Sequence, residues 1–155
     1  MSFASAQDSE KIFWKEGGLS WEDFKSSPLK SSSFHANTSA GISYSWSIKN
    51  ENGIVELKYE VLSFFNPNGS WVKPGSKNDY LLQHEQLHFD ITELHARKLR
   101  EKLSEIKISQ LGKDPKTVLN KYYQTIERER ALMQQKYDLE TNHSLNKEAE
   151  AKWQE

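Results

Sequence analysis

The chain has 155 residues, which fits one domain with its own core, and its 28% charged residues and mean hydropathy of −0.83 indicate a heavily solvated surface. Its 21 basic and 22 acidic residues give a formal net charge of −1, and no apolar run approaches the roughly 20 residues of a membrane span, so neither a nucleic-acid partner nor a membrane span is expected. The sequence contains no cysteine, which excludes disulfides, thiolate metal sites and a cysteine nucleophile, so any metal must be held by His, Asp or Glu.

A small-residue motif lies at the N-terminus. Ala4-Ser5-Ala6 has the small-x-small form that signal peptidase accepts, although no basic start and no full apolar stretch precede it. We therefore expect residues 1–10 to be either the remnant of a signal peptide or a disordered terminus. The first alternative predicts a secreted or periplasmic protein. In both cases we expect residues 11–155 to form a single domain.

Residues 11–75 have the composition of strands and turns, because short aromatic or β-branched stretches are separated by Gly, Ser, Asn and Pro. From residue 42 to 49 apolar side chains alternate with serines and a lysine, which is the period of two expected for a half-buried strand. Residues 54–65 continue in the same way, and Asn50-Glu51-Asn52-Gly53 between the two runs predicts a hairpin loop. Ser70-Trp71-Val72 lies between two breaker segments and predicts an edge strand or a docked loop.

Two long helices are predicted in the second half of the chain. Residues 78–106 contain neither Gly nor Pro, their apolar and histidine side chains recur at steps of three and four, and Asn78 or Asp79 is the expected N-cap. A second helix is expected from Lys116 to Tyr137. Its candidate buried positions are Val118, Leu119, Tyr122, Ile126, Leu132, Met133 and Tyr137.

The first predicted helix contains the pattern His-Glu-x-x-His, as His84-Glu85-Gln86-Leu87-His88. Four residues advance a helix by about 400° and roughly 6 Å, so the imidazoles of His84 and His88 leave the same face and can converge on one zinc ion. Glu85, about 100° further round the helix, cannot join them as a ligand. It can act as a general base that takes a proton from a zinc-bound water as this water attacks a carbonyl. The pattern therefore predicts a zinc site that hydrolyses amides.

A catalytic zinc usually has three protein ligands, so a third must come from elsewhere. His95 shares the face of His88 but lies about 10 Å further along the helix axis, which is too far for one ion, and it is expected in the core. The remaining candidates are His35 in the β part and Asp138, Glu140 and His143 near the end of the second helix. His143 is favoured, because a second helix that doubles back along the first brings its end near His84.

Two acidic residues follow the motif on the first helix. Asp90 is expected to orient a ligand or to have no role in the site. Glu93 lies about 140° from the ligand face and is expected to be a solvated helix residue.

These stretches resemble a family of bacterial proteins known as predicted secreted zinc-dependent proteases, domain of unknown function 922. The matching stretches are Leu19 to Phe24, Ser70 to Val72, Leu82 to Asp90 and Tyr137 to Ser144. The last stretch recurs in that family as Tyr-Asp-x-x-Thr-x-His. This implies that His143 is the third ligand and that Asp138 hydrogen-bonds to a metal ligand without binding the metal itself. The resemblance also implies export from the cell.

Two further positions have expected roles in a zincin-like protein. Tyr137 could donate a hydrogen bond to the oxyanion that forms on attack, but a buried core position is favoured. Ser70-Trp71-Val72 could pair with the backbone of a peptide substrate, although Trp71 can equally belong to the core.

We expect an α+β, zincin-like fold in which a small, mostly antiparallel N-terminal sheet precedes the motif helix and a second long helix. The expected function is zinc-dependent hydrolysis of peptide or protein substrates, with Glu85 as the catalytic base. The first alternative is an exported protein that binds zinc without turnover. The second is a protein-interaction module in which the histidine pattern is accidental.

Overall fold

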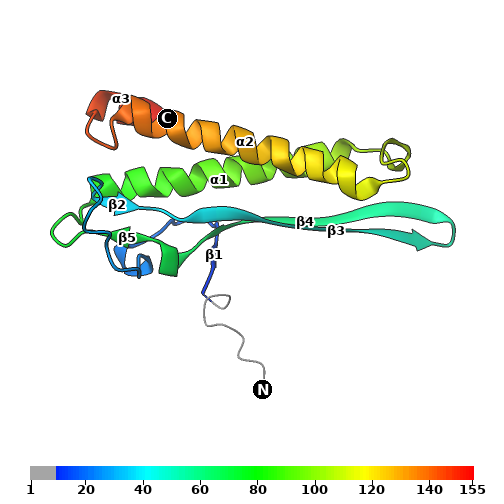
Figure 1. Ribbon diagram of the computed structural model, residues 1–155, viewed down its shortest axis with the longest axis horizontal. Helices are drawn as coiled ribbons and strands as arrows, with labels where there is room; N and C mark the ends of the chain where they lie inside the picture. Colours follow the sequence, from blue (N-terminus) through cyan, green and yellow to red (C-terminus); the bar gives the residue numbers. More distant parts are fainter. Residues whose placement is uncertain (1–9) are drawn as a thin grey trace, which may run out of the picture.

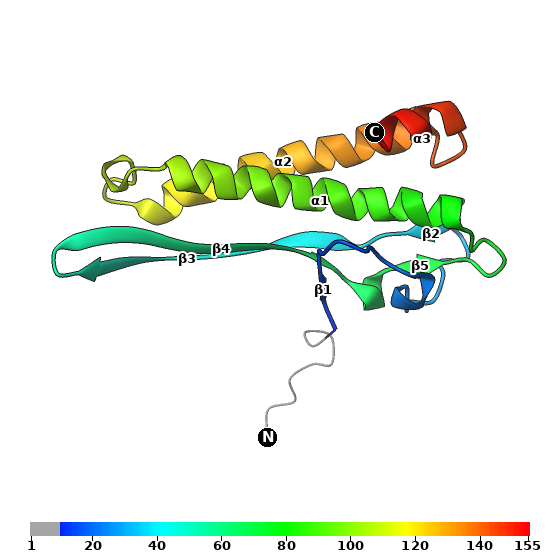
Figure 2. The same cartoon turned by 180° about the vertical axis from the view of Figure 1, so that it is seen from behind.

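A computed structural model of the protein describes residues 10–155. The fold is α+β, with two long helices lying side by side over one face of a small antiparallel sheet (Figures 1 and 2). The predicted motif at Ala4 to Ala6 lies outside the described residues. Within residues 10–155, no helix is both long and apolar enough to cross a membrane.

The sheet is dominated by a long hairpin of β3 (Ala40–Glu51) and β4 (Ile54–Phe65), which pair antiparallel in register from Ala40↔Phe65 to Glu51↔Ile54. Asn52 and Gly53 connect them with φ angles of 54° and 82°. Both angles are left-handed, as in the tight turns that match the twist of a hairpin. The predicted hairpin and its loop are therefore confirmed.

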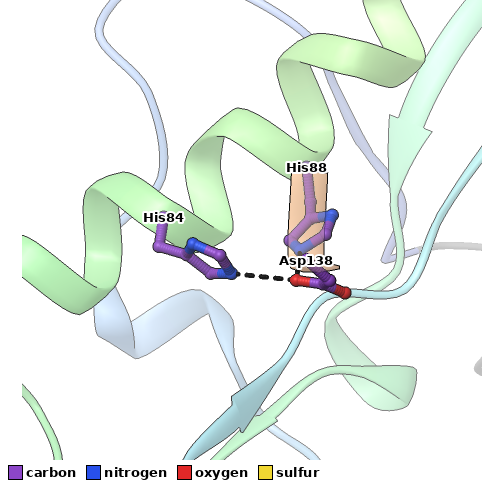
Figure 3. Close-up of side chains that lie close together, drawn as sticks. All are labelled: His84, His88 and Asp138. Atoms are coloured by element: carbon purple, nitrogen blue, oxygen red, sulfur yellow. Dashed lines mark hydrogen bonds and ion pairs between the residues drawn. The ribbon is translucent and has the colours of Figure 1, made fainter. Parts of the chain in front are cut away.

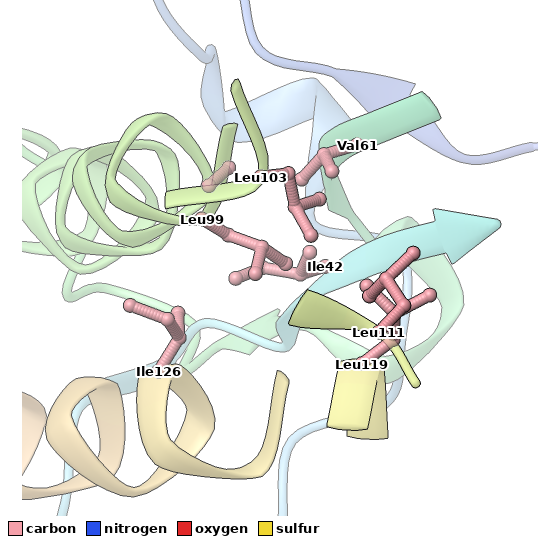
Figure 4. Close-up of a cluster of buried hydrophobic side chains, with 8 residues drawn as sticks. Ile42, Val61, Leu99, Leu103, Leu111, Leu119 and Ile126 are labelled. Atoms are coloured by element: carbon pink, nitrogen blue, oxygen red, sulfur yellow. The ribbon is translucent and has the colours of Figure 1, made fainter. Parts of the chain in front are cut away.

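The hairpin presents its apolar face to the helices. Ile42 and Val61 are buried there with Leu99 and Leu103 of α1 (Asp79–Glu105) and with residues of the segment that follows (Figure 4). The alternate residues of β3, mainly serines, face away from this core, as the period of two predicts. The core thus fixes the motif helix against the sheet.

The first long helix, α1, begins where the sequence predicts it to begin. The side chain of Asn78 accepts a hydrogen bond from the backbone N–H of Leu81 at 2.8 Å and caps the first turn. After Glu105 the backbone becomes extended at Ile106, so the predicted span is confirmed to within one residue at each end.

The second long helix, α2 (Pro115–Thr141), is antiparallel to α1 (Figure 1), as the sequence predicts, but extends four residues beyond the expected end at Tyr137. Leu119, Ile126 and Tyr137 are buried as expected. Leu132 was expected in the core but is 60% exposed. It follows Ile126 by six residues, which is about 240° round the helix, so it faces away from α1.

Three short strands and a short helix complete the fold. β1 (Ile12–Phe13) pairs with β4, and β2 (Ala36–Asn37) pairs with β5 (Trp71–Val72), so the predicted edge strand at Ser70 to Val72 is present. A second buried cluster supports the first half of α1, and consists of Leu19, Phe24, Ala36, Phe65, Val72, Leu81 and Phe89. A short helix that was not predicted from the sequence, α3 (Lys147–Trp153), packs on the end of α2.

Candidate metal centre

Two histidine rings project from α1 toward α2. His84 and His88 are one helical turn apart, and their ring centroids are 5.0 Å from each other. Their Nε2 atoms point toward the carboxylate of Asp138 on α2 (Figure 3). The convergence of the two imidazoles that the motif predicts is therefore present.

Asp138 occupies the position between the two rings. Its Oδ1 atom lies 3.2 Å from Nε2 of His84 and 2.9 Å from Nε2 of His88, and the three candidate ligand atoms are all within 4.8 Å of one another. Ligand atoms about 2.0–2.1 Å from a tetrahedral zinc are about 3.3–3.4 Å apart. The two distances from Asp138 are close to this value, so the three side chains form a group that could hold one metal ion.

The other ring nitrogens are held from outside the cluster. Nδ1 of His84 donates to Oε2 of Glu150 at 2.8 Å. Nδ1 of His88 donates to Oε1 of Gln134 at 2.5 Å, and the Gln134 amide is oriented by its own bond to the backbone oxygen of His88 at 2.9 Å. With its Nδ1 protonated, each neutral ring turns an Nε2 lone pair toward Asp138. Two lone pairs and a carboxylate that face one another would be stabilised by a positive charge between them.

The electrostatics of the cluster favour that positive charge. Burial works against a charge on Asp138, but the neighbouring His84 and His88 outweigh it and hold the pKa of Asp138 below its ordinary value. Burial also works against a charged His88, yet Asp138, Glu85 and Gln134 together raise the pKa of His88. The surroundings thus keep a carboxylate ionised and stabilise positive charge at Nε2, whether a proton or a metal ion carries it.

Glu85 is buried next to the histidines. The hydroxyl of Thr38 donates to its Oε2 at 2.5 Å and to its backbone oxygen at 3.2 Å. Burial raises the pKa of Glu85, and His88, Thr38 and His84 partly oppose this shift. The side chain is therefore held in one orientation beside the candidate ligands.

His143 reaches the cluster from the turn that follows α2. Its Nδ1 lies 3.7 Å from Oδ1 of Asp138, and its ring packs on Phe34 with centroids 4.3 Å apart. Its side chain is 41% exposed, far more than those of His84 and His88. The structure thus brings His143 beside the site, and its expected role as the third ligand stays a prediction.

The turn that carries His143 is strained. Asn142, His143 and Ser144 have φ angles of 46°, 51° and 78°, a left-handed region in which each non-glycine residue costs about 1 kcal/mol or more. The turn is held by a bond from Tyr80 Oη to the backbone oxygen of Ser144 at 2.5 Å and by a bond from the N–H of Asn146 to the oxygen of Thr141 at 2.7 Å. Such strain is found most often where a function requires the conformation.

The candidate ligands open into a cavity of about 440 Å³. Its walls come from the segment around β2, from the first turns of α1, and from the end of α2 with the turn that follows. The residues that line it include His35, Thr38, His84, Glu85, His88, Arg130, Gln134, Asp138 and His143. A cleft of this size, with mixed polar and apolar walls and several convergent polar groups, is large enough for a small ligand or part of a substrate.

Asp90 contacts none of the candidate ligands among the described hydrogen bonds. Its Oδ1 accepts hydrogen bonds from Trp14 Nε1 at 2.8 Å and from Gln86 Nε2 at 2.9 Å. Asp90 follows His88 by two residues, which is about 200° round the helix, so its carboxylate points away from the cluster. It fastens the N-terminal segment to the far side of α1.

The expectation that Glu93 is solvated is wrong. Its side chain is buried against β4, where Oε1 accepts bonds from Arg97 Nε at 3.0 Å and Arg100 Nη1 at 3.2 Å, and Oε2 accepts one from Ser63. Burial works against ionisation, but the bonds from Ser63, Arg100 and Arg97 outweigh it and lower the pKa of Glu93. The angle of Glu93 to the ligand face does not predict this burial, because it depends on the approach of β4.

Tyr137 is a core residue, as favoured, and does not line the cavity. Its ring stacks on that of His84, with centroids 4.6 Å apart and an interplanar angle of 22°, and its hydroxyl donates to Glu150. Burial, together with Glu150, raises the pKa of Tyr137, so the hydroxyl stays protonated. This placement supports His84 and gives no support to an oxyanion role.

Three residues that contact the cluster were not found from the sequence: Thr38, Gln134 and Glu150. Gln134 precedes Asp138 by four residues on one helix, a spacing that places both on the same face. That signal was available once Asp138 was a candidate. Thr38 lies 47 positions from Glu85, and Glu150 lies 66 positions from His84. No local sequence pattern predicts contacts over such separations.

Comparison with known proteins gives a family match for part of the chain. No curated protein and no solved structure matches the chain. Residues 76–144 match a family described as bacterial protein of unknown function (DUF922), a segment that contains all of α1 and α2 but ends before Glu150. This segment includes both motif histidines, Asp138 and His143, so the similarity to DUF922 covers the candidate metal centre.

Proposed function

We propose that the protein is a zinc-dependent peptidase in which His84, His88 and Asp138 hold the metal and Glu85 is the general base. The main support is the convergence of two Nε2 atoms and one carboxylate oxygen at zinc-ligand spacing, with Glu85 on the same cavity wall. We propose that His143, whose Nδ1 lies 3.7 Å from Asp138 Oδ1, either joins this set or contacts a substrate in the cavity.

The bound zinc would supply a polarised water and a Lewis acid for the substrate carbonyl. The chain supplies the remaining elements. His84 and His88 keep their Nε2 lone pairs free for the ion, because Glu150 and Gln134 hold their Nδ1 protons. Oε2 of Glu85 accepts a hydrogen bond from the Thr38 hydroxyl, and this bond fixes the orientation of the carboxylate. Within residues 10–155 no hydrogen bond reaches its Oε1, and this oxygen would take the proton from the water.

A zinc-binding protein without turnover is the second candidate, and one observation favours it. Four potential ligands, rather than three, lie close together when His143 is counted with His84, His88 and Asp138. Structural zinc sites usually have four protein ligands and no open position. If all four side chains bind at once, no position remains for a catalytic water.

Replacement of Glu85 by Gln separates the two candidates. Zinc content by elemental analysis and the cleavage of a quenched fluorescent peptide library would be measured for the wild type and for Glu85→Gln. If the protein is a peptidase, both the wild type and Glu85→Gln should bind zinc, but only the wild type should cleave the peptides. Glu101→Gln, at an exposed position of the same helix, is the matched control and should cleave normally. Zinc binding without cleavage by any form would favour the second candidate, and equal cleavage by Glu85→Gln would exclude Glu85 as the base.

A further inference from the structure

Glu150 is a buried carboxylate on α3, outside the segment that matches the family. It is only 2% exposed. Its two oxygens accept hydrogen bonds from Nδ1 of His84 at 2.8 Å, from Nε2 of Gln154 at 3.2 Å and from the hydroxyl of Tyr137. A carboxylate so deeply buried is tolerated only when such donors compensate for its lost hydration.

The contacts of Glu150 converge on one ligand ring. Tyr137, which donates to Glu150, also stacks on the His84 ring, and its hydroxyl lies 3.3 Å from the backbone oxygen of His84. The ring is therefore held by stacking on one face and by the Nδ1 bond at its edge. Because Nδ1 must carry the proton in that bond, Nε2 is left as the lone pair that faces Asp138.

The same residues hold α3 in place. A helix of seven residues has too few turns to be stable alone in water. Here Trp153 packs on Tyr137 with centroids 5.0 Å apart and donates to Glu140 at 2.7 Å, while Gln154 donates to the backbone oxygen of Gln83 at 3.3 Å. Among the described hydrogen bonds, Glu150 is the only residue of α3 that contacts His84, His88, Asp138 or His143.

We propose that Glu150 is a positioning residue of the metal centre, through which zinc binding and the docking of α3 stabilise each other. The inference rests on the proposed zinc site but not on peptidase activity. A carboxylate on Nδ1 fixes the tautomer of a histidine ligand and increases the basicity of its Nε2. Zinc binding and the docking of α3 are two coupled equilibria, and such coupling is reciprocal. A zinc ion bound to Nε2 of His84 should therefore also strengthen the hydrogen bond between His84 and Glu150.

Zinc affinity of the full chain tests the positioning role. Competition with a chromogenic chelator should show that Glu150→Ala weakens zinc binding by about 10- to 100-fold, and that Glu150→Gln, which keeps an acceptor, has a smaller effect. Glu148→Gln is the matched control, because its side chain is 85% exposed on the same helix. With Co²⁺ in place of zinc, the absorption spectrum should change in Glu150→Ala and not in the control, which a merely structural role would not produce.

Hydrogen exchange tests the reciprocal effect. Zinc should slow the exchange of the backbone amides of residues 147–153 in the wild type and should have less effect in Glu150→Gln. Unchanged zinc affinity in both Glu150 variants, or equal exchange of α3 with and without zinc, would overturn the inference. If the wild type binds no zinc, the inference fails together with the proposed site. If the wild type binds zinc and cleaves peptides while the Glu150 variants bind normally, only the inference fails.

Discussion

The carboxylate of Asp138 lies 2.9 Å from Nε2 of His88, although 50 positions separate the two residues in the sequence. The contact exists because α2 runs antiparallel along α1 and brings its last turns beside the motif. The candidate metal centre is therefore a product of helix packing. Side chains that control this packing should affect metal binding as much as the ligands do.

Asp138 and His143 are the two candidates for the third ligand, and variants at these positions should differ in zinc affinity. We expect Asp138→Asn to lose most of its zinc affinity, because its carboxylate oxygen is close to both histidine nitrogens. His143→Ala should lose less, since its Nδ1 lies 3.7 Å away from that oxygen and its side chain is exposed. Chelator competition measures both. The reverse order of affinities would make His143 the third ligand, as the family resemblance implies.

Thr38 should affect catalysis without affecting metal binding. Thr38→Val removes the hydroxyl that holds the Glu85 carboxylate and should lower kcat by about 10- to 100-fold. Zinc content should be unchanged, because Thr38 bonds to no candidate ligand. Thr38→Ser retains a hydroxyl and should recover most of the activity. A Thr38→Val enzyme with normal kcat would show that Glu85 needs no such support.

Glu93 should make a pH-dependent contribution to stability. Its pKa is lowered in the folded state, so the native protein binds fewer protons, and the stabilisation is present above the ordinary glutamate pKa of about 4.3 and lost as the pH falls below it. Glu93→Gln should lower the free energy of unfolding by about 1–2 kcal/mol at neutral pH. The difference between the two proteins in urea unfolding should shrink below about pH 4. A difference that does not depend on pH would mean that packing, rather than charge, explains the loss.

His95 should contribute to loss of stability in acid. It is fully buried, Nδ1 bonds to the backbone oxygen of Ile91 at 2.7 Å, and Nε2 has no partner within the described part of the chain. Burial lowers the pKa of His95, so the native protein resists protonation and loses stability as the pH falls below the ordinary histidine value of about 6.5.

A leucine at this position has no proton to gain. The free energy of unfolding of His95→Leu should therefore fall less than that of the wild type between about pH 7.5 and pH 5.5. The other histidines are the same in both proteins, so their contributions cancel in the comparison. An equal fall in both would show that His95 is protonated without cost.

The parts of the structure that were predictable from the sequence are those that depend on local spacing. His84 and His88 follow from a four-residue step on a helix, and the hairpin loop at Asn50 to Gly53 follows from turn chemistry between two alternating runs. The antiparallel course of α2 followed from chain direction, and with it the approach of His143.

The other parts depend on contacts between distant segments. The position of Asp138 between the rings depends on the register of α2 against α1, which no sequence pattern specifies. Glu150 belongs to a helix too short for a clear periodic signal. The burial of Glu93 results from the approach of β4 to the side of α1 opposite the ligands.

The most direct test of the central claim is the zinc content of the purified wild type by elemental analysis, after zinc is supplied and weakly bound metal is removed by dialysis against a mild chelator. The proposed site predicts equimolar zinc in the wild type and in Glu101→Gln, and loss of zinc in His88→Ala, which removes an Nε2 ligand without disturbing the caps of α1. No retained zinc in the wild type, or equal retention in His88→Ala, would contradict the assignment of a metal centre to this cluster.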